Sequence, residues 1–97
     1  MRLEFADRSL RERSVNVALA ERSWGVPVAR KYVVRLSQLK SAPSRADLMA
    51  LRALRLHPLR GGREGQWAID LHSRWRLVVS FDADTVIIEE VSNHYGD

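Results

Sequence analysis

The spacing of hydrophobic residues changes near the middle of this chain. Up to residue 53 they recur mostly at intervals of three and four, and from Leu54 onward they alternate with polar residues. The first spacing predicts helices that bury one side, and the second predicts strands of a sheet with one buried face. We therefore expect an α+β domain with its helices in the first half and most of its strands in the second.

The first half is expected to form a strand and three helices. Alternation at residues 2–5 favours a short strand, and the Ser9–Glu12 stretch resembles a capping box that opens a first long helix ending near Trp24. Pro27 suits the first turn of a second long helix, and Ser44 suits the cap of a short third helix. The apolar stripe expected on the second helix consists of Ala29, Tyr32 or Val33, Leu36 and Leu39.

The second half predicts a mainly antiparallel, twisted sheet of about four strands. Alternation from Leu54 indicates that one strand begins there, and residues 82–84 are typical of a turn before a last strand at 85–91. The residues expected to face the helices are Trp67, Ile69 and Leu71 in one strand and Trp75, Leu77, Val79 and Phe81 in the next. The opposite face is expected to bring together Arg55, His57, Arg74 and Arg76.

The composition limits the class of protein. The 97 residues suffice for a single domain, 1–97, that buries roughly two thirds of its unfolded surface. There is no cysteine, so neither a disulfide framework nor a thiolate metal site can form, and the three histidines are too scattered for a metal motif. We expect no metal and no cofactor. The chain has no apolar run of about 18 residues and no signal-peptide pattern at its start, so we expect a cytoplasmic protein without a membrane partner.

Basic residues are concentrated in the first half. Residues 1–56 carry twelve Arg and Lys against five Asp and Glu, whereas residues 57–97 carry four against seven. Fourteen of the sixteen basic residues are arginine, which suits bidentate binding of phosphate but also results from a GC-rich genome. Basicity alone therefore says little about the partner. Arg30, Lys31, Arg35 and Lys40 are expected on a solvent-exposed face of the second long helix, in preference to the alternative that they form a dedicated RNA-binding stripe.

The most informative stretch runs from Leu56 to Trp67. It places His57, Arg60 and Arg63 around glycines, between two runs typical of strands. Guanidiniums bind a phosphodiester bidentately, glycines let the backbone approach closely, and imidazole exchanges a proton near neutral pH. Chemistry on an RNA backbone needs all three properties.

Two motifs resemble the RelE/ParE superfamily of bacterial toxins, and its HigB branch in particular. They are Leu56-His57-Pro58-Leu59-Arg60-Gly61 with Arg63-Glu64-Gly65-Gln66-Trp67, and then Trp75-Arg76-Leu77. The resemblance is specific over residues 56–95 and concerns only the order of elements before that. It implies a small α+β fold whose helices pack on one face of the sheet and leave the other face open.

The resemblance also implies a function. Members of this branch cleave messenger RNA in the ribosomal A site without a metal, and a co-encoded antitoxin silences them. The partners it implies are the ribosome, messenger RNA and a HigA-like antitoxin with a helix-turn-helix, through which alone the toxin reaches operator DNA. Two other functions stay open, because one scaffold hosts several activities: a ParE-like toxin that poisons DNA gyrase, and an inactive member that acts only in an antitoxin or operator complex.

Matching positions give the site residues that the resemblance implies. His57 matches the histidine of the His-Pro-Leu motif, Arg60 and Arg63 match its basic turn, and Arg76 matches the arginine after tryptophan. HigB-like toxins commonly end in Asp-Tyr-His, whereas the matching residues here are Asn93-His94-Tyr95. The acid is thus replaced by an amide, and the last two residues are exchanged.

We expect five catalytic residues: His57, Arg63, Arg76, His94 and Tyr95. The two histidines would share the acid and base work, the two arginines would hold the scissile phosphate, and the tyrosine would stack on a base or act as the acid. Neighbouring phosphates would be bound by Arg55, Arg60, Arg74 and Asn93.

Structural roles compete with these assignments. His57 precedes a proline, and its imidazole could simply bond to the backbone at the end of a strand. Arg76 could be an ordinary arginine of the sheet face, paired with Asp70 or Glu89. His72 lies beside Ser73 in an expected tight turn, so we interpret it as structural or exposed to solvent.

Overall fold

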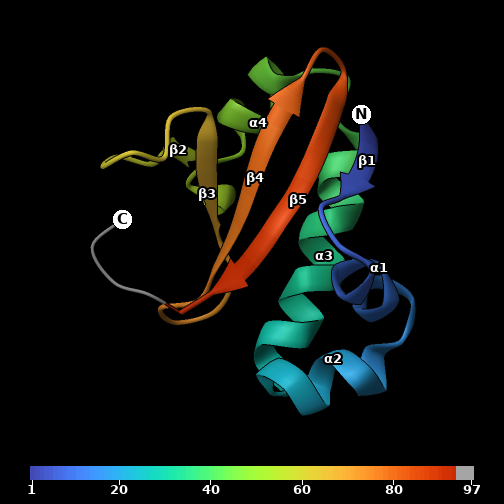
Figure 1. Ribbon diagram of the computed structural model, residues 1–97. Helices are drawn as coiled ribbons and strands as arrows, with labels where there is room; N and C mark the ends of the chain where they lie inside the picture. Colours follow the sequence, from blue (N-terminus) through green and yellow to red (C-terminus); the bar gives the residue numbers. More distant parts are fainter. Residues whose placement is uncertain (94–97) are drawn as a thin grey trace.

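The computed structural model describes residues 1–93, which form a layer of helices on one face of a sheet (Figure 1). The sheet has five strands in the order β1-β5-β4-β3-β2. The elements in chain order are β1 (Arg2–Phe5), α1 (Arg8–Val15), α2 (Val17–Trp24), α3 (Val26–Ser41), α4 (Arg45–Ala50), the 3-10 helix η1 (Arg52–Leu54), β2 (His57–Pro58), β3 (Gln66–Asp70), β4 (Arg76–Asp82) and β5 (Thr85–Ser92). Within residues 1–93, no helix has the length and apolar character needed to cross a membrane.

The sheet is mainly antiparallel, as the sequence predicts. The N-terminal strand β1 is parallel to β5, and all other neighbouring strands are antiparallel. The pairing of β4 with β5 is irregular, because Val78 lies opposite Glu90 whereas Val79 lies opposite Ile88. Glu89 is therefore the extra residue of a β-bulge, which alters how the side chains of β5 alternate between the two faces.

The first long helix predicted from the sequence is in fact two short helices. Asn16 ends α1 with an extended backbone, and its side chain accepts a hydrogen bond from the Leu19 amide at the start of α2. The predicted capping box is also wrong. The N-cap of α1 is Asp7, whose carboxylate accepts from the Leu10 amide over 2.9 Å, while Ser9 donates to the same carboxylate. Because the Asp7 carboxylate already accepts from the free amide in the first turn of α1, Ser9 does not act as the cap.

The strand predicted from Leu54 is wrong as well. Residues 52–54 form η1, and Arg55 then adopts a left-handed conformation with φ 48° and ψ 45°. A left-handed residue turns the chain sharply, which interrupts an extended run. Pairing with β3 begins only at His57, so β2 is two residues long.

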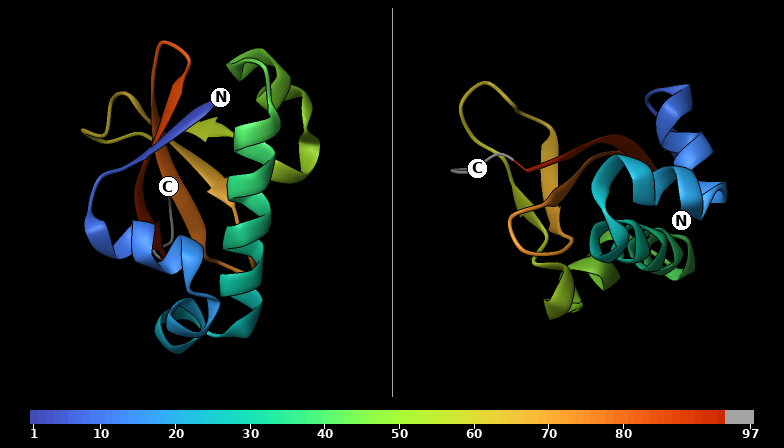
Figure 2. Two further views of the ribbon diagram at one scale, coloured as in Figure 1. Left: turned by 90° about the vertical axis from the view of Figure 1, so that its right-hand side faces the viewer. Right: turned by 90° about the horizontal axis from the view of Figure 1, so that it is seen from below.

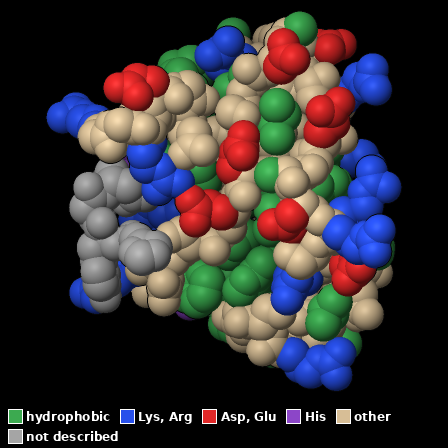
Figure 3. Space-filling model, viewed as in Figure 1, with side chains coloured by type: hydrophobic (Ala, Val, Ile, Leu, Met, Phe, Trp, Pro, Cys, Tyr) green, Lys and Arg blue, Asp and Glu red, His purple; other side chains and the backbone are tan. Residues whose placement is uncertain are grey.

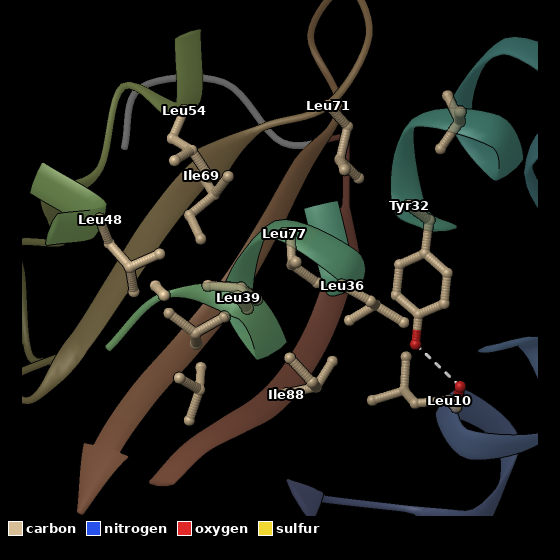
Figure 4. Packing of buried hydrophobic residues seen from close by; sticks show 14 residues of the cluster. Leu10, Tyr32, Leu36, Leu39, Leu48, Leu54, Ile69, Leu71, Leu77 and Ile88 are labelled. Atoms are coloured by element: carbon tan, nitrogen blue, oxygen red, sulfur yellow. Dashed lines mark hydrogen bonds between the residues drawn. The ribbon is translucent and has the colours of Figure 1, made fainter. Parts of the chain in front are cut away.

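The main core lies between the helices and the sheet (Figure 4). Its largest fully buried side chain is that of Tyr32 on α3, whose hydroxyl donates to the main-chain oxygen of Leu10 over 2.8 Å. This bond ties α3 to α1 inside the apolar layer. From the sheet, the core receives Ile69, Leu77, Val79, Val86 and Ile88, and Trp67 and Trp75 pack at its border as expected.

The sheet face opposite the helices, called the open face below, is turned toward the viewer in Figure 1, and both views of Figure 2 place α3 on the other side of the sheet. It carries a separate small cluster of buried residues: Leu59, Ala68 and Val78. Leu59 belongs to the β2–β3 loop, so this loop covers part of the face. The remainder of the open face carries the polar side chains that the sequence singled out.

Candidate functional site

The strand register determines which polar side chains share the open face. His57 pairs with Ala68, which pairs with Val78, which in turn lies opposite Glu90. Cross-strand partners point to the same face, so one row runs from His57 on β2 to Glu90 on β5. In the next row, Asp70 pairs with Arg76, and Arg76 lies opposite Ser92 at the end of β5.

Asp70 joins two arginines on this face. Its Oδ2 lies 3.2 Å from Arg55 Nε, and its Oδ1 lies 3.1 Å from Arg76 Nε. The side chain of Arg55 is 63% exposed, whereas that of Arg76 is only 18% exposed. Arg76 also donates through Nη1 to the main-chain oxygens of Ser73 and Trp75. The alternative that pairs Arg76 with Asp70 is thus observed.

His57 has a defined orientation. Its Nδ1 lies 2.6 Å from the main-chain oxygen of Arg55. A carbonyl oxygen only accepts hydrogen bonds, so Nδ1 must carry the proton. In the neutral imidazole, Nε2 is then the nitrogen with a free lone pair. The backbone contact anticipated as a structural alternative therefore also prepares the ring to accept a proton.

The β2–β3 loop brings Arg63 across the open face to β5. Its guanidinium forms an ion pair with Glu90 through Nη2 and donates from Nε to Gln66 Oε1 over 2.8 Å. The loop itself is held by main-chain bonds from Leu59 to Gln66 and from Gln66 to Arg63. Arg63 therefore lies at the Glu90 end of the row that begins with His57 on β2.

Carboxylates are as prominent on the open face as guanidiniums. The bulge directs both Glu89 and Glu90 to this side, and Glu89 accepts a hydrogen bond from the Ser80 hydroxyl over 2.6 Å. Figure 3 shows acidic side chains in the middle of the view, over β4 and β5, with Lys and Arg side chains to both sides. The face is therefore a set of ion pairs rather than a uniformly basic surface.

The predicted site residues fall into three groups. The contacts above bring Arg55, His57, Arg63 and Arg76 to one face. Other predicted residues lie exposed, in the β2–β3 loop, in the β3–β4 turn and after β5: Arg60, Arg74 and Asn93. His94 and Tyr95 lie outside the described residues. His72 is exposed in the β3–β4 turn, in keeping with the interpretation given to it.

One groove of the molecule lies away from these residues. It has a volume of about 520 Å³ and lies on the helix side, between β1, α1 and α3, where Phe5, Val15 and Val33 contribute to its lining. It contains no predicted site residue. Across residues 1–93, no group of three or more His, Cys, Asp or Glu side chains is arranged to hold a metal ion.

The sequence interpretation missed the role of Arg35. It was expected on a solvated face of α3, yet it is only 5% exposed. Its Nε donates to the main-chain oxygen of Asp70 over 2.8 Å, and its Nη2 donates to that of Ala53 over 3.0 Å. Burial lowers the pKa of this guanidinium, and the charge of Asp70 opposes that effect. The sequence did contain one signal for its burial: Arg35 follows Tyr32 by three residues and so lies on the same buried stripe of the helix.

Comparisons with known proteins bear on the fold and on part of the sequence. None of the known protein-family models matches this chain. A stretch of 41 residues, 41% of the chain, is 39% identical to the endoribonuclease HigB of Proteus vulgaris and covers 45% of that protein, so the match spans less than half of this relative. The structure is similar to the YoeB/ParE toxin of Agrobacterium tumefaciens, with a TM-score of 0.63, 18% identity and coverage of 98% and 100% of the two chains. The chain has the RelE/ParE toxin fold.

A second solved structure has the same fold. YafQ of E. coli matches with a TM-score of 0.58 and 17% identity, over 95% of this chain and 92% of YafQ. The expected RelE-like α+β architecture is thereby confirmed. Identities this low establish the RelE/ParE fold and leave the chemistry to the residues of the open face.

Proposed function

We propose that this protein is the toxin of a type II toxin-antitoxin pair and acts as an endoribonuclease on messenger RNA bound to the ribosome. The observation that carries the proposal is the orientation of His57. Its protonated Nδ1 bonds to Arg55, which leaves Nε2 as a base on the face where Arg55, Arg63 and Arg76 gather. The similarity of one segment to the endoribonuclease HigB supports the same activity.

The proposed reaction is an attack of the 2′-hydroxyl on the adjacent phosphorus. The bond from the 2′-oxygen to phosphorus forms, and the bond from phosphorus to the 5′-oxygen breaks. His57 Nε2 takes the proton of the 2′-hydroxyl, and an acid returns a proton to the departing 5′-oxygen. The products are a 2′,3′-cyclic phosphate and a 5′-hydroxyl. We assign the acid role to His94 or Tyr95, which lie outside the described residues.

The arginines have a separate role in this proposal. Negative charge accumulates on the non-bridging phosphate oxygens during the attack, and guanidiniums that are already in place stabilise it. Arg63 and Arg76 would hold the scissile phosphate. Flanking phosphates would contact Arg55, Arg60, Arg74 and Asn93. Neither step of this reaction requires a metal ion bound by the toxin.

The proposed partners follow from this activity. The ribosome presents the message, and a HigA-like antitoxin with a helix-turn-helix silences the toxin and carries it to operator DNA. No membrane partner is proposed. A short neighbouring reading frame with a helix-turn-helix pattern would support this pairing.

Primer extension on messages from cells induced to express the protein tests the proposal. Cuts linked to codons, with chains ending in 2′,3′-cyclic phosphates, are the expected result. DNA damage without RNA cuts would instead identify a gyrase poison. Growth arrest that survives both His94→Ala and Arg76→Ala would show that the residue assignments are wrong, even if messages are cut.

A further inference from the structure

We propose that Asp70 is a positioning residue, which holds Arg55 and Arg76 as an ordered pair so that both guanidiniums meet one stretch of RNA backbone. This inference rests on the proposed function and adds a role for a carboxylate that faces the substrate side. Asp70 is not expected to bind a polyanion itself, because phosphate and carboxylate repel each other.

The geometry of the triad supports an ordering role. Each carboxylate oxygen contacts a different arginine, and both contacts are made through Nε, at 3.2 Å and 3.1 Å. Two guanidiniums this close would repel each other without an anion between them. Asp70 cancels one of the two charges, so the triad keeps a net charge of +1 and still attracts a phosphate.

The two arginines differ in how tightly they are held. Arg76 is fixed further by the main-chain oxygens of the β3–β4 turn, and its Nε and Asp70 Oδ1 are buried atoms without a hydrogen bond to any described residue. These two atoms depend on their ion pair with each other. Among the described residues, the Arg55 side chain is held by a single ion pair, through Nε, and it is largely exposed and so accessible to an RNA phosphate.

Asp70 is itself anchored from the opposite side of the sheet. The buried Arg35 binds the main-chain oxygen of Asp70 and that of Ala53, and so links β3 to η1. Arg55 follows η1 directly, and its left-handed backbone directs its carbonyl to His57. Through Arg35, the helix layer therefore fixes how far the Asp70 carboxylate lies from Arg55 and from His57.

The experiment compares Asp70→Asn with Asp82→Asn, which removes the same charge at the β4–β5 hairpin, away from the triad. Single-turnover cleavage and the Kd of a short single-stranded RNA are measured for both variants. Asp70→Asn should bind RNA at least as tightly as the original protein, because a negative charge is lost, yet cleave roughly tenfold to a hundredfold more slowly because the arginines lose their order. Asp82→Asn should cleave at the original rate.

A purely structural role would give a different result. Asp70→Asn that cleaves as fast as the original protein would overturn the inference, and so would a parallel loss of binding and cleavage in folded protein. Arg55→Lys provides a second variant. The lysine keeps the positive charge at this exposed position but lacks the Nε–H that contacts Asp70. It should lower the cleavage rate without a matching loss of RNA affinity, and unchanged cleavage would contradict the positioning role.

A readout independent of cleavage separates this inference from the proposed function. In the original protein, the Nε–H groups of Arg55 and Arg76 should give resolved NMR signals that exchange slowly with water. Both signals should weaken or disappear in Asp70→Asn and persist in Asp82→Asn. If the original protein cuts no RNA but the signals respond in this way, the proposed activity fails and the ordering role stands. Signals that are unchanged in Asp70→Asn would overturn the ordering role.

Discussion

Arg35 donates a hydrogen bond from Nε to the main-chain oxygen of Asp70 over 2.8 Å, from the helix side of the sheet. The carboxylate of the same Asp70 faces the other way and holds the arginines of the open face. One residue of β3 thus connects the buried layer with the candidate site. Substitutions of Arg35 in the core should therefore change the positions of the arginines on the open face.

Replacing Arg35 with lysine tests this connection. An ammonium group keeps the charge but cannot reach the three acceptors that the guanidinium binds, so buried carbonyl oxygens lose their donors. The free energy of unfolding should fall by about 2 kcal/mol, measured by urea denaturation. Arg30→Lys, on the exposed side of the same helix, is the matched control and should leave the midpoint unchanged. Equal midpoints for both variants would mean that Arg35 contributes little.

Tyr32→Phe should destabilise the protein by about 1–2 kcal/mol, because the buried carbonyl of Leu10 loses its donor. Burial also raises the pKa of Tyr32 above its ordinary value of 10.0. A raised pKa in the folded state means that this contribution is complete below about pH 10 and declines as the pH rises further. Thermal unfolding as a function of pH should show this alkaline decline in the original protein. The decline should be absent in Tyr32→Phe, and its persistence there would refute the assignment.

Asp7 should make stability depend on acid pH. The hydrogen bond from the Leu10 amide, together with that from the Ser9 hydroxyl, lowers the pKa of Asp7 below its ordinary value of 3.8. Because its pKa is lowered, Asp7 stabilises the folded state fully at pH values above its ordinary pKa. This stabilisation is lost as the pH falls through the lowered pKa. Asp7→Asn keeps a capping oxygen and should flatten the acid limb of the stability curve. Asp7→Ala should lower stability at neutral pH as well.

His57→Gln should lower the rate of messenger cleavage by roughly a hundredfold or more, because the amide cannot take the proton of the 2′-hydroxyl. His72→Gln is the control, since it removes an exposed imidazole in the β3–β4 turn. Single-turnover rates on ribosome-bound message measure the difference. A His57→Gln variant that keeps the original rate would exclude His57 as the base.

Local patterns predicted the elements whose side chains repeat regularly. The stripe that includes Tyr32 and Leu39 gave α3 its correct place, and the turn at residues 82–84 gave the β4–β5 hairpin. The same reasoning failed around Leu54. There a 3-10 turn is followed by the left-handed residue Arg55, and over so few residues this conformation gives the same alternation of apolar and polar residues as a strand.

The site was predictable only in part, for a related reason. Alternation placed His57 and Arg76 on one face, because register fixes the side of the sheet. Arg55 precedes β2 and reaches this face through its ion pair with Asp70. It did not identify the partners of Arg63 and Arg35. Arg63 pairs with a residue 27 positions away, and Arg35 bonds to the backbone of one 35 positions away. Such contacts arise from the packing of layers and leave no local signal.

The claim that RNA binds the open face can be tested directly by NMR titration with a short single-stranded RNA whose 2′-hydroxyls are methylated to prevent cleavage. Binding at the open face should shift the signals of the His57 imidazole and of the Nε–H groups of Arg55 and Arg63. The methyl groups of Val15 and Val33, in the groove on the helix side, should not move. Shifts confined to that groove, with the open-face signals unchanged, would contradict RNA binding at the open face.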